Sequence, residues 1–424
     1  MSHAVVNAEV IAIGSEMLFS DRVDTNSAYI GSQLEHFGVP LVAKSIVGDD
    51  SKLIKQALAM ALTRADFIFL TGGLGPTEDD LTRHAVSELL GLELRYQAEI
   101  VDRIRGRFRR LGRTMHEINK RQGFILDTAV ALDNPHGTAP GQYLRYEGRH
   151  LFLLPGPPRE LQPMIQSHLV PLLVRLGFSP WARRYFRISG VPESQVDATV
   201  APIYRRYPEI RSTILASPGE IELIFIADQE SPRLSELAAG ISQALGDDIY
   251  TTEEISLEAI LVGRLREGGV TLSVAESCTG GMLGEWITRV PGSSDVFRGG
   301  VIAYSNALKS QMLGVSRKLL RSEGAVSAPV AKAMADGVRR RCGSDFGLSV
   351  TGIAGPGGGS EAKPVGTVFV ACSDGTRKTP RKTALGFHFL GDREVIRLLS
   401  TRAALNLLRK ELLRPGRGAR GPED

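Results

Sequence analysis

Ser277 has the surroundings that best suit nucleophilic chemistry in this sequence of 424 residues. The segment VAESCTGG places it at the end of an apolar strand, directly before two glycines and a predicted helix. Such a strand–turn–helix corner lifts one side chain above the edge of a sheet and leaves backbone N–H groups free to form an oxyanion hole. A serine here also suits a helix cap, and the pattern alone leaves both interpretations open.

A serine nucleophile needs a base, and the segment YSNALK offers Lys309 beside Tyr304 and Asn306. His388 is the only histidine in the C-terminal third of the sequence, and its position favours no pairing with the serine. A neutral lysine can serve as the base if burial lowers its pKa. The alternative is a solvated lysine on a helix surface.

The cysteines supply a competing nucleophile but no disulfide framework. Cys278, Cys342 and Cys372 are odd in number, far apart and without metal-ligand spacing, which fits a reducing compartment. Cys278 follows Ser277, and a helix N-terminus would lower the pKa of its thiol. Alternation along the strand should point the two side chains in opposite directions, so we favour Ser277.

Two further C-terminal motifs suit the binding of an anion. The segment TGIAGPGGG, from Thr351 to Gly359, follows a predicted strand, and its glycines would let backbone amides approach a phosphate. It matches neither a dinucleotide-binding nor a Walker loop, and a flexible loop is the alternative. Arg393, in the segment GDRE, could add a positive charge or form an ordinary ion pair in the first turn of the last helix.

The N-terminal motifs IGSEML, TGGLGPTEDDLT, NPHGTAPG and LPGPPREL all fall in loops that follow predicted strands. In an open α/β sheet such loops line one crevice at the carboxyl ends of the strands. The glycines of the second motif suit close approach of a phosphate. The carboxylates available for a magnesium ion are Glu16, Asp79 and Asp80, although the last two could merely cap the next helix.

Alternating strand and helix patterns predict an α/β protein with several domains. We expect an N-terminal domain with a parallel sheet over residues 1–177, and a small β-α-β-β-α-β unit of ferredoxin-like type over 178–254. A second α/β domain follows over 255–413, and a disordered tail over 414–424. The middle unit contains no cluster of catalytic residue types and suits a spacer or a dimerisation module.

Composition excludes several classes of protein. Apolar residues make up 42% and charged residues 23%, with a net charge of +4, which suits a globular protein and is too weak to indicate a nucleic-acid or membrane partner. We expect no signal peptide and no membrane-spanning helix, and hence a cytoplasmic location. The basic segment RIRGRFRRLGR has apolar residues at helical spacing, which favours a solvated helix face over a DNA-binding surface.

The segments VAESCTGG, GGVIAYSNALKSQMLGV, TGIAGPGGG and PVGTVFVA together resemble the C-terminal domain of the CinA family, which also occurs alone as a nicotinamide mononucleotide (NMN) deamidase. The resemblance implies a metal-free amidohydrolase in which Ser277 is the nucleophile and Lys309 the activating base. It also implies substrate contacts from the same motifs. These residues are Tyr304, Asn306, Thr351, Gly352, Gly355, Arg393 and Gly280.

The N-terminal motifs resemble the CinA N-terminal domain, which is related to the molybdopterin-binding MoaB/MogA fold. The resemblance implies hydrolysis of ADP-ribose with Mg²⁺ or another divalent cation in some members, and a homodimer. The substrate contacts that it implies are Gly72, Gly73, Gly75, Asn26, Thr82, Gly137 and Thr138. Ser20 departs from the glycine usual in the family's first loop.

The sequence thus predicts an enzyme of pyridine-nucleotide salvage that acts on NMN and ADP-ribose. Two alternatives stay open. The N-terminal domain could bind a pterin or nucleotide without turnover, or the protein could be a competence or DNA-repair adaptor that works through partners.

Overall fold

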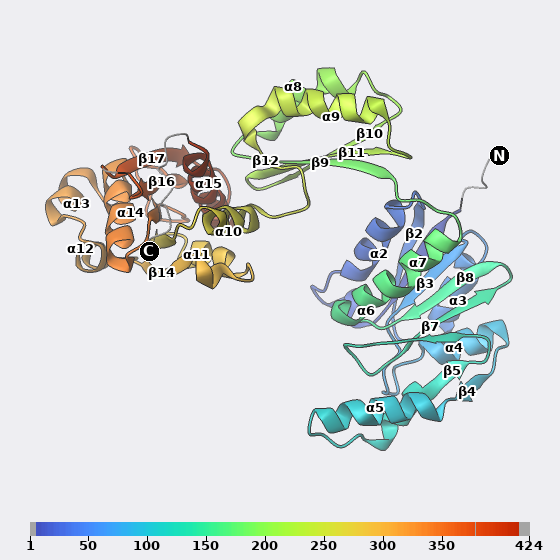
Figure 1. The fold of residues 1–424 in the computed structure, drawn as a ribbon. Coiled ribbons are helices and arrows are strands. Elements are labelled where there is room, and N and C mark those ends of the chain that lie inside the picture. Colours follow the sequence, from blue (N-terminus) through green and yellow to red (C-terminus); the bar gives the residue numbers. More distant parts are fainter. Residues whose placement is uncertain (1–5, 378, 415–424) are drawn as a thin grey trace, which may run out of the picture. The chain divides into compact units, whose positions relative to one another are not determined.

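The chain forms two compact units, residues 1–181 and 182–424, in the computed structural model (Figure 1). The structure describes residues 6–377 and 379–414, so the predicted tail lies outside the described residues apart from Arg414. No helix within these ranges is both long and apolar enough to cross a bilayer. The mixed α/β class predicted from the sequence is confirmed, with several separate sheets.

The first unit is built around a six-stranded sheet in the order β2-β1-β3-β8-β7-β6. Its strands, with the separate pair β4 and β5, are β1 (Ala8–Ile13), β2 (Leu41–Val47), β3 (Phe67–Thr71), β4 (Leu94–Tyr96), β5 (Phe124–Leu126), β6 (Val130–Leu132), β7 (Gly141–Tyr146) and β8 (Arg149–Leu154). Its helices are α1 (Glu16–Phe19), α2 (Thr25–Glu35), α3 (Ser51–Ala61), α4 (Thr82–Leu90), α5 (Ala98–Arg110), α6 (Pro158–Met164) and α7 (Val170–Arg175).

Helices cover both faces of this sheet. β1 and β3 are buried along their whole length, which explains why they read as continuous apolar runs. Helices α2, α6 and α7 share one hydrophobic core with one face, while α3 and α4 share another with the opposite face. Since β2, β1, β3 and β8 are parallel, the loops after β1, β3 and β8 meet at one edge.

Local side-chain and backbone contacts set the ends of the helices in this unit. α2 is capped by Asp24, which accepts from the N–H of Ser27. α4 begins only at Thr82, because the Asp80 carboxylate binds backbone N–H groups of the preceding loop. A π-helical turn over residues 165–169 separates α6 from α7.

The second unit contains a four-stranded sheet followed by a five-stranded one. Its strands are β9 (Ala182–Ser189), β10 (Arg211–Ser217), β11 (Glu220–Ala227), β12 (Ile249–Thr251), β13 (Leu272–Glu276), β14 (Phe297–Ile302), β15 (Phe346–Gly352), β16 (Thr367–Asp374) and β17 (Arg381–His388). Its helices are α8 (Glu193–Tyr204), α9 (Pro232–Leu245), α10 (Leu257–Glu267), α11 (Met282–Thr288), α12 (Asn306–Leu313), α13 (Arg317–Glu323), α14 (Ala328–Cys342) and α15 (Arg393–Leu413).

The four-stranded sheet has the predicted β-α-β-β-α-β element order. Its strands are antiparallel in the order β10-β11-β9-β12, and the hairpin turns at Pro218 and Gly219, as the sequence indicated. We refer to residues 182–251 as the middle module. Its core lies between the sheet and helices α8 and α9.

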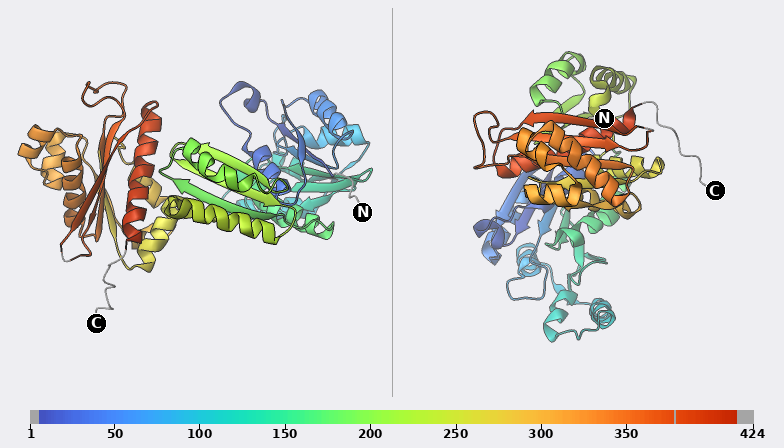
Figure 2. Two further views of the ribbon diagram at one scale, coloured as in Figure 1. Left: turned by 90° about the horizontal axis from the view of Figure 1, so that it is seen from above. Right: turned by 90° about the vertical axis from the view of Figure 1, so that its left-hand side faces the viewer.

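The five-stranded sheet has the order β14-β13-β15-β16-β17, with β14, β13 and β15 parallel and the last two antiparallel to their neighbours. Helices α10, α11 and α15 pack on one face, and α12, α13 and α14 on the other (Figure 2). We call residues 255–413 the C-terminal module.

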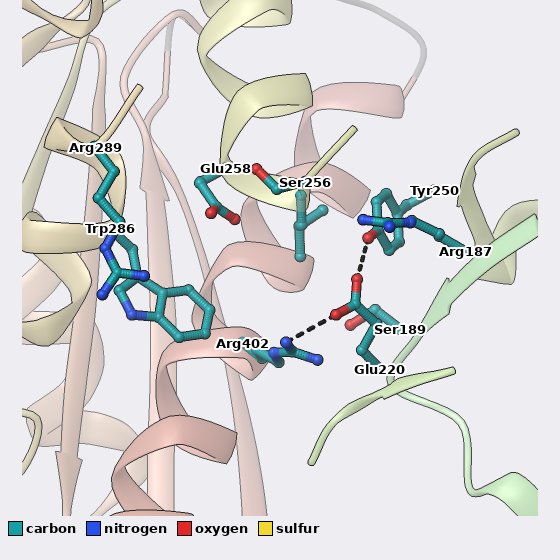
Figure 3. A pocket seen from close by; sticks show the side chains of 10 residues that line it. Arg187, Ser189, Glu220, Tyr250, Ser256, Glu258, Trp286, Arg289 and Arg402 are labelled. Carbon is teal, nitrogen blue, oxygen red and sulfur yellow. Dashed lines mark hydrogen bonds and ion pairs between the residues drawn. The ribbon is translucent and has the colours of Figure 1, made fainter. Parts of the chain in front are cut away.

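Helix α15 joins the two modules of this unit. Arg402 pairs with Glu220 at 2.8 Å and lies over the Trp286 ring, while Tyr250 donates to the same Glu220 (Figure 3). These residues border a cavity of about 150 Å³. Further along the helix, Asn406 donates to the carbonyl of Ser189. The helix is therefore held at several points by the middle module.

Two helical glycines allow a test of this packing. Gly337 on α14 faces α12, and a Cβ there would lie 2.0 Å from the carbonyl oxygen of Leu313, whereas Gly263 on α10 has open space around it. We expect Gly337→Ala to lower the free energy of unfolding by about 1–3 kcal/mol. Gly263→Ala should raise it by about 0.8–1 kcal/mol, since alanine is the better helix former. Urea unfolding measures both, and a stabilised Gly337→Ala variant would contradict the described contact.

Candidate active site

Ser277 lies directly after β13, the strand flanked by parallel β14 and β15. The carboxyl ends of these strands share one edge of the sheet, so the loops that follow them meet there. Tyr304 comes after β14, and Thr351 and Gly352 end β15. The topology thus brings together three motifs that are far apart in the sequence.

Ser277 and Lys309 face each other across this edge. The Nζ atom of Lys309 lies 3.0 Å from the Ser277 hydroxyl oxygen, and the two residues are only 2% and 8% exposed, respectively. The same nitrogen donates to the carbonyl of Ala303 at 2.8 Å and lies 3.4 Å from that of Tyr304. The alternative of a solvated lysine is therefore wrong.

The electrostatic state of Lys309 follows from this burial. Its three hydrogen-bond partners in the described part of the chain are neutral oxygens. Loss of hydration penalises the charged ammonium, so burial lowers the pKa of Lys309 below its ordinary value of 10.5. A lowered pKa favours the neutral amine, and a neutral amine can accept a proton from a neighbouring hydroxyl.

Glu276 fixes the turn that presents the serine. This buried carboxylate accepts hydrogen bonds from the backbone N–H groups of Gly281, Leu283 and Gly284 at the start of α11. Gly281 is the N-cap residue of that helix, so Ser277 is not its cap. A glutamate ahead of a glycine pair and a helix was the available signal, and the sequence analysis missed it.

Backbone N–H groups remain available in the same turn. Within the described residues, that of Thr279 donates to no acceptor, and that of Cys278 contacts only its own thiol. The buried Thr279 hydroxyl also lacks a partner, while its carbonyl accepts from Arg397 at 2.7 Å. The turn therefore offers donors next to the serine, held in place by an arginine on α15 that the sequence analysis did not single out.

Cys278 does not suit the role of nucleophile. Its side chain is buried, and the loss of hydration raises the pKa of the thiol to about 11. The helix N-terminus begins only at Met282. The expected lowering of the thiol pKa is therefore wrong, and the hydroxyl remains the better candidate.

Arg393 joins two of the predicted substrate motifs. Its guanidinium donates to the carbonyl of Gly355 at 2.6 Å and to the Tyr304 hydroxyl at 3.1 Å. Thr351 is buried and donates to the carbonyl of Ala325. These contacts connect the glycine-rich loop, the end of β14 and the first turn of α15.

The other predicted C-terminal residues are placed as follows. Gly280 has φ +61° in the turn after the serine, where a side chain would be strained. Asn306 is exposed and borders a cavity of about 270 Å³ with Arg317 and Arg321. His388 ends β17, which is separated from β13 by two strands, β15 and β16.

In the first unit, the predicted glycines make room for protein atoms. A Cβ at Gly72 would lie 2.1 Å from the carbonyl oxygen of Ile13, and one at Gly73 would lie 2.3 Å from the Thr82 hydroxyl oxygen. Thr82 donates that hydroxyl to the carbonyl of Gly72 at 2.8 Å. These positions require glycine for the packing of the loop itself, a reason that the sequence did not reveal.

The rest of this loop is braced by two charged residues. Asp80 accepts from the N–H groups of Gly75 and Thr77. Buried Arg83 donates to the carbonyls of Leu74 and Gly75, and its loss of hydration lowers its pKa to about 10. Arg83 is a positioning residue that the sequence analysis missed.

Two further loops meet the glycine loop. The amide nitrogen of Asn26 donates to the carbonyl of Gly156 at 2.7 Å, and a Cβ on Gly156 would lie 3.7 Å from the Cα atom of Gly72. The Asn26 amide oxygen is buried and has no partner within the described residues. Gly137 and Thr138 lie in the loop before β7.

The three predicted metal ligands do not form a ready-made site. Glu16 and Asp79 are exposed, and both carboxylate oxygens of Asp80 accept hydrogen bonds from the loop. Within the described ranges, no three His, Cys, Asp or Glu side chains gather in a way that could hold a metal ion. These residues by themselves therefore form no preformed metal centre.

Comparison with known proteins decides the family. The CinA C-terminal domain family matches residues 254–412, and the family described as "Probable molybdopterin binding domain" matches residues 9–175. A "CinA-like protein" of Solibacter usitatus is 44% identical over 96% of this chain and 98% of its own length. Another, of Acidobacterium capsulatum, is 46% identical over 96% of this chain and its whole length. The chain belongs to the CinA family.

Membership of the CinA family confirms the predicted resemblance at both ends of the chain. The C-terminal match covers the module that holds Ser277 and Lys309, and the N-terminal match covers the six-stranded sheet and its glycine loop. The solved "competence/damage inducible protein CihA" of Agrobacterium tumefaciens is 36% identical over 39% of this CinA chain and 100% of its own, with a TM-score of 0.35.

The burial of Lys309 makes a prediction about stability. Because the folded-state pKa is lowered, the unfolded chain binds more protons between that value and 10.5, so this lysine makes the free energy of unfolding rise with pH. Urea unfolding at pH 7, 8 and 9 should show a steeper rise for the unmodified protein than for Lys309→Met.

Lys318→Met, which alters an exposed lysine on α13, provides the control and should follow the unmodified protein. If the free energy of unfolding changed with pH in the same way for the unmodified protein and Lys309→Met, burial would not lower the pKa of the Lys309 amine.

Proposed function

We propose that the C-terminal module is an NMN deamidase, which converts NMN and water to nicotinic acid mononucleotide and ammonia. The observation that carries the proposal is the buried contact of 3.0 Å between the amine of Lys309 and the hydroxyl of Ser277. Unlike a histidine-based triad, this pair needs no third residue to set a tautomer, because an amine has none.

In the first half of the reaction, the Ser277 hydroxyl oxygen attacks the amide carbon of the substrate. Its proton passes to the neutral Nζ of Lys309, and the carbonyl oxygen gains the negative charge. The N–H groups of Cys278 and Thr279 are the donors closest in sequence to the nucleophile and would stabilise that charge.

In the second half, Lys309 returns the proton to the nitrogen of the substrate as the C–N bond breaks. Ammonia leaves, and an ester joins the substrate to Ser277. Water then attacks this ester with Lys309 again as the base, and the product acid and the serine hydroxyl are restored. No cofactor takes part in this scheme.

The remaining contacts would orient the substrate. Arg393 lies between Tyr304 and Gly355 and adds positive charge at the rim of the site, where the ribose phosphate of NMN carries negative charge. Binding energy from such a remote phosphate can position the amide.

The nucleophile can be tested by substitution. We expect Ser277→Ala to lower ammonia release from NMN by at least about 1,000-fold, since the attacking atom is lost. Cys278→Ala should retain most of the activity, because its thiol takes no part. A coupled ammonia assay measures both, and loss of activity only in Cys278→Ala would reverse the assignment.

We propose ADP-ribose hydrolysis, to AMP and ribose 5-phosphate, as a second activity in the first unit. It is supported by the meeting of three loops at the carboxyl edge of the parallel strands and by the unpartnered amide oxygen of Asn26. Because the carboxylates here form no cage of their own, a divalent cation would depend on phosphate oxygens of the substrate for its coordination.

Chelation separates the two proposed activities. With EDTA, ADP-ribose cleavage should fall to the background rate, whereas ammonia release from NMN should change less than twofold in the same preparation. Ser277→Ala should give the opposite pattern. Chromatographic identification of AMP and nicotinic acid mononucleotide provides the measurement, and loss of deamidation in EDTA would contradict the metal-free scheme.

The same experiment separates the alternatives. A module that only binds a pterin or nucleotide would bind ADP-ribose without releasing AMP, and an adaptor protein would release neither product. We also propose a homodimer, which the family resemblance implies, and a cytoplasmic location, which the sequence composition favours.

A further inference from the structure

We propose that a groove between α5 and the loop before β7 binds the phosphates of a nucleotide diphosphate. The inference rests on the proposed second activity and extends it, since it assigns the positive charge that such a substrate needs. It also gives a role to part of the basic segment that the sequence analysis interpreted as a solvated helix face.

The groove has the size of a nucleotide site. Its volume is about 610 Å³, within the range of about 300–1,000 Å³ that is typical of small-molecule sites. One wall is α5 and the other is the loop over residues 133–140, which includes the predicted contacts Gly137 and Thr138. The apolar side chains of Ile100 and Ile104 belong to the small core beneath α5.

Its charge favours an anion. Arg103, Arg107 and Arg110 are spaced four and three residues apart, so they lie on one face of the helix, and all three line the groove against a single acidic residue, Asp133. Arg103 pairs with Asp133 at 3.3 Å, where both side chains are more than half exposed. Such a pair is weak, so a phosphate can compete for the guanidinium.

The guanidiniums of Arg107 and Arg110 form no ion pair with a carboxylate within the described residues. Arg107 donates to the carbonyl of Pro135, a neutral acceptor, at 2.5 Å. Arg110 makes no ion pair within the described residues. Planar guanidiniums with spare N–H groups are well suited to bidentate binding of phosphate.

The donors and the positive charge at the glycine loop, where the sequence had placed the phosphates, are already bound to protein groups. The N–H groups of Gly75 and Thr77 are taken by Asp80, and buried Arg83 is bound to two carbonyls. The glycine loop therefore has little to offer a diphosphate, whereas the arginine face of α5 has three cationic groups.

A short chain of contacts joins the groove to the glycine edge. Asn134 lies in the groove wall and donates to the Glu160 carboxylate at 2.8 Å and to the carbonyl of Ala139. Glu160 belongs to the first turn of α6, four residues after Gly156, which approaches Gly72. The loop that forms the groove wall is therefore linked through α6 to the loop that meets Gly72.

The test compares two double variants of the full-length protein with the same loss of charge. Arg107→Gln with Arg110→Gln alters the groove, while Arg105→Gln with Arg109→Gln alters two arginines of α5 that do not line it. Titration calorimetry with inorganic pyrophosphate should show binding weakened by at least about tenfold in the first and by less than about twofold in the second. Circular dichroism and the melting temperature check that both variants fold.

Equal weakening in both variants, or no pyrophosphate binding to the unmodified protein, would overturn the proposal. Tighter binding of a single-stranded oligonucleotide that depends on the groove arginines would also overturn it, in favour of nucleic acid. An assay of ADP-ribose cleavage distinguishes the two proposals. If the groove binds pyrophosphate but the protein does not cleave ADP-ribose, the groove proposal is supported and the proposed activity is wrong. If the groove variant cleaves ADP-ribose with an unchanged KM, the proposed activity is supported and the groove proposal is wrong.

Discussion

The contact between a buried amine and a hydroxyl is the constraint on which the C-terminal module depends. An ammonium at Lys309 has three neutral oxygen partners, so the protein supplies hydrogen bonds without a balancing negative charge. Desolvation then favours the neutral amine, which is the form that can take a proton from Ser277. Any change that admitted water or a carboxylate would raise the pKa of this amine again.

The surrounding structure holds this pair in place. The Glu276 carboxylate accepts hydrogen bonds from N–H groups at the start of α11 and so fixes the turn. Arg397 on α15 donates to the carbonyl of Thr279 in the same turn. That helix also carries Arg393 at the rim of the site and Arg402 at the middle module. A single long helix therefore connects the edge of the candidate active site with the middle module.

The first unit uses charged groups in a different way. Arg83 and Asp80 shape the glycine loop through hydrogen bonds to its backbone groups, because charges removed from water must find partners within the protein. The glycines themselves accommodate neighbouring backbone and side-chain atoms. The positive charge left for a ligand lies instead on α5. In the proposed site, the glycine loop would position the ligand and the arginines of α5 would attract its phosphates.

The sequence by itself determined the α/β class and the middle module, because apolar periodicity carries that information. The pairing of Ser277 with Lys309 came from the resemblance of their motifs to the CinA family, since the residue pattern alone fits a solvated lysine equally well. The sequence did not reveal the roles of Glu276 and Arg397, since these depend on which backbone groups a side chain reaches after folding. It also could not tell that Arg107 and Arg110 face a groove whereas Arg109 does not. Only the tertiary structure decides that, because the opposite wall comes from a loop more than twenty residues away.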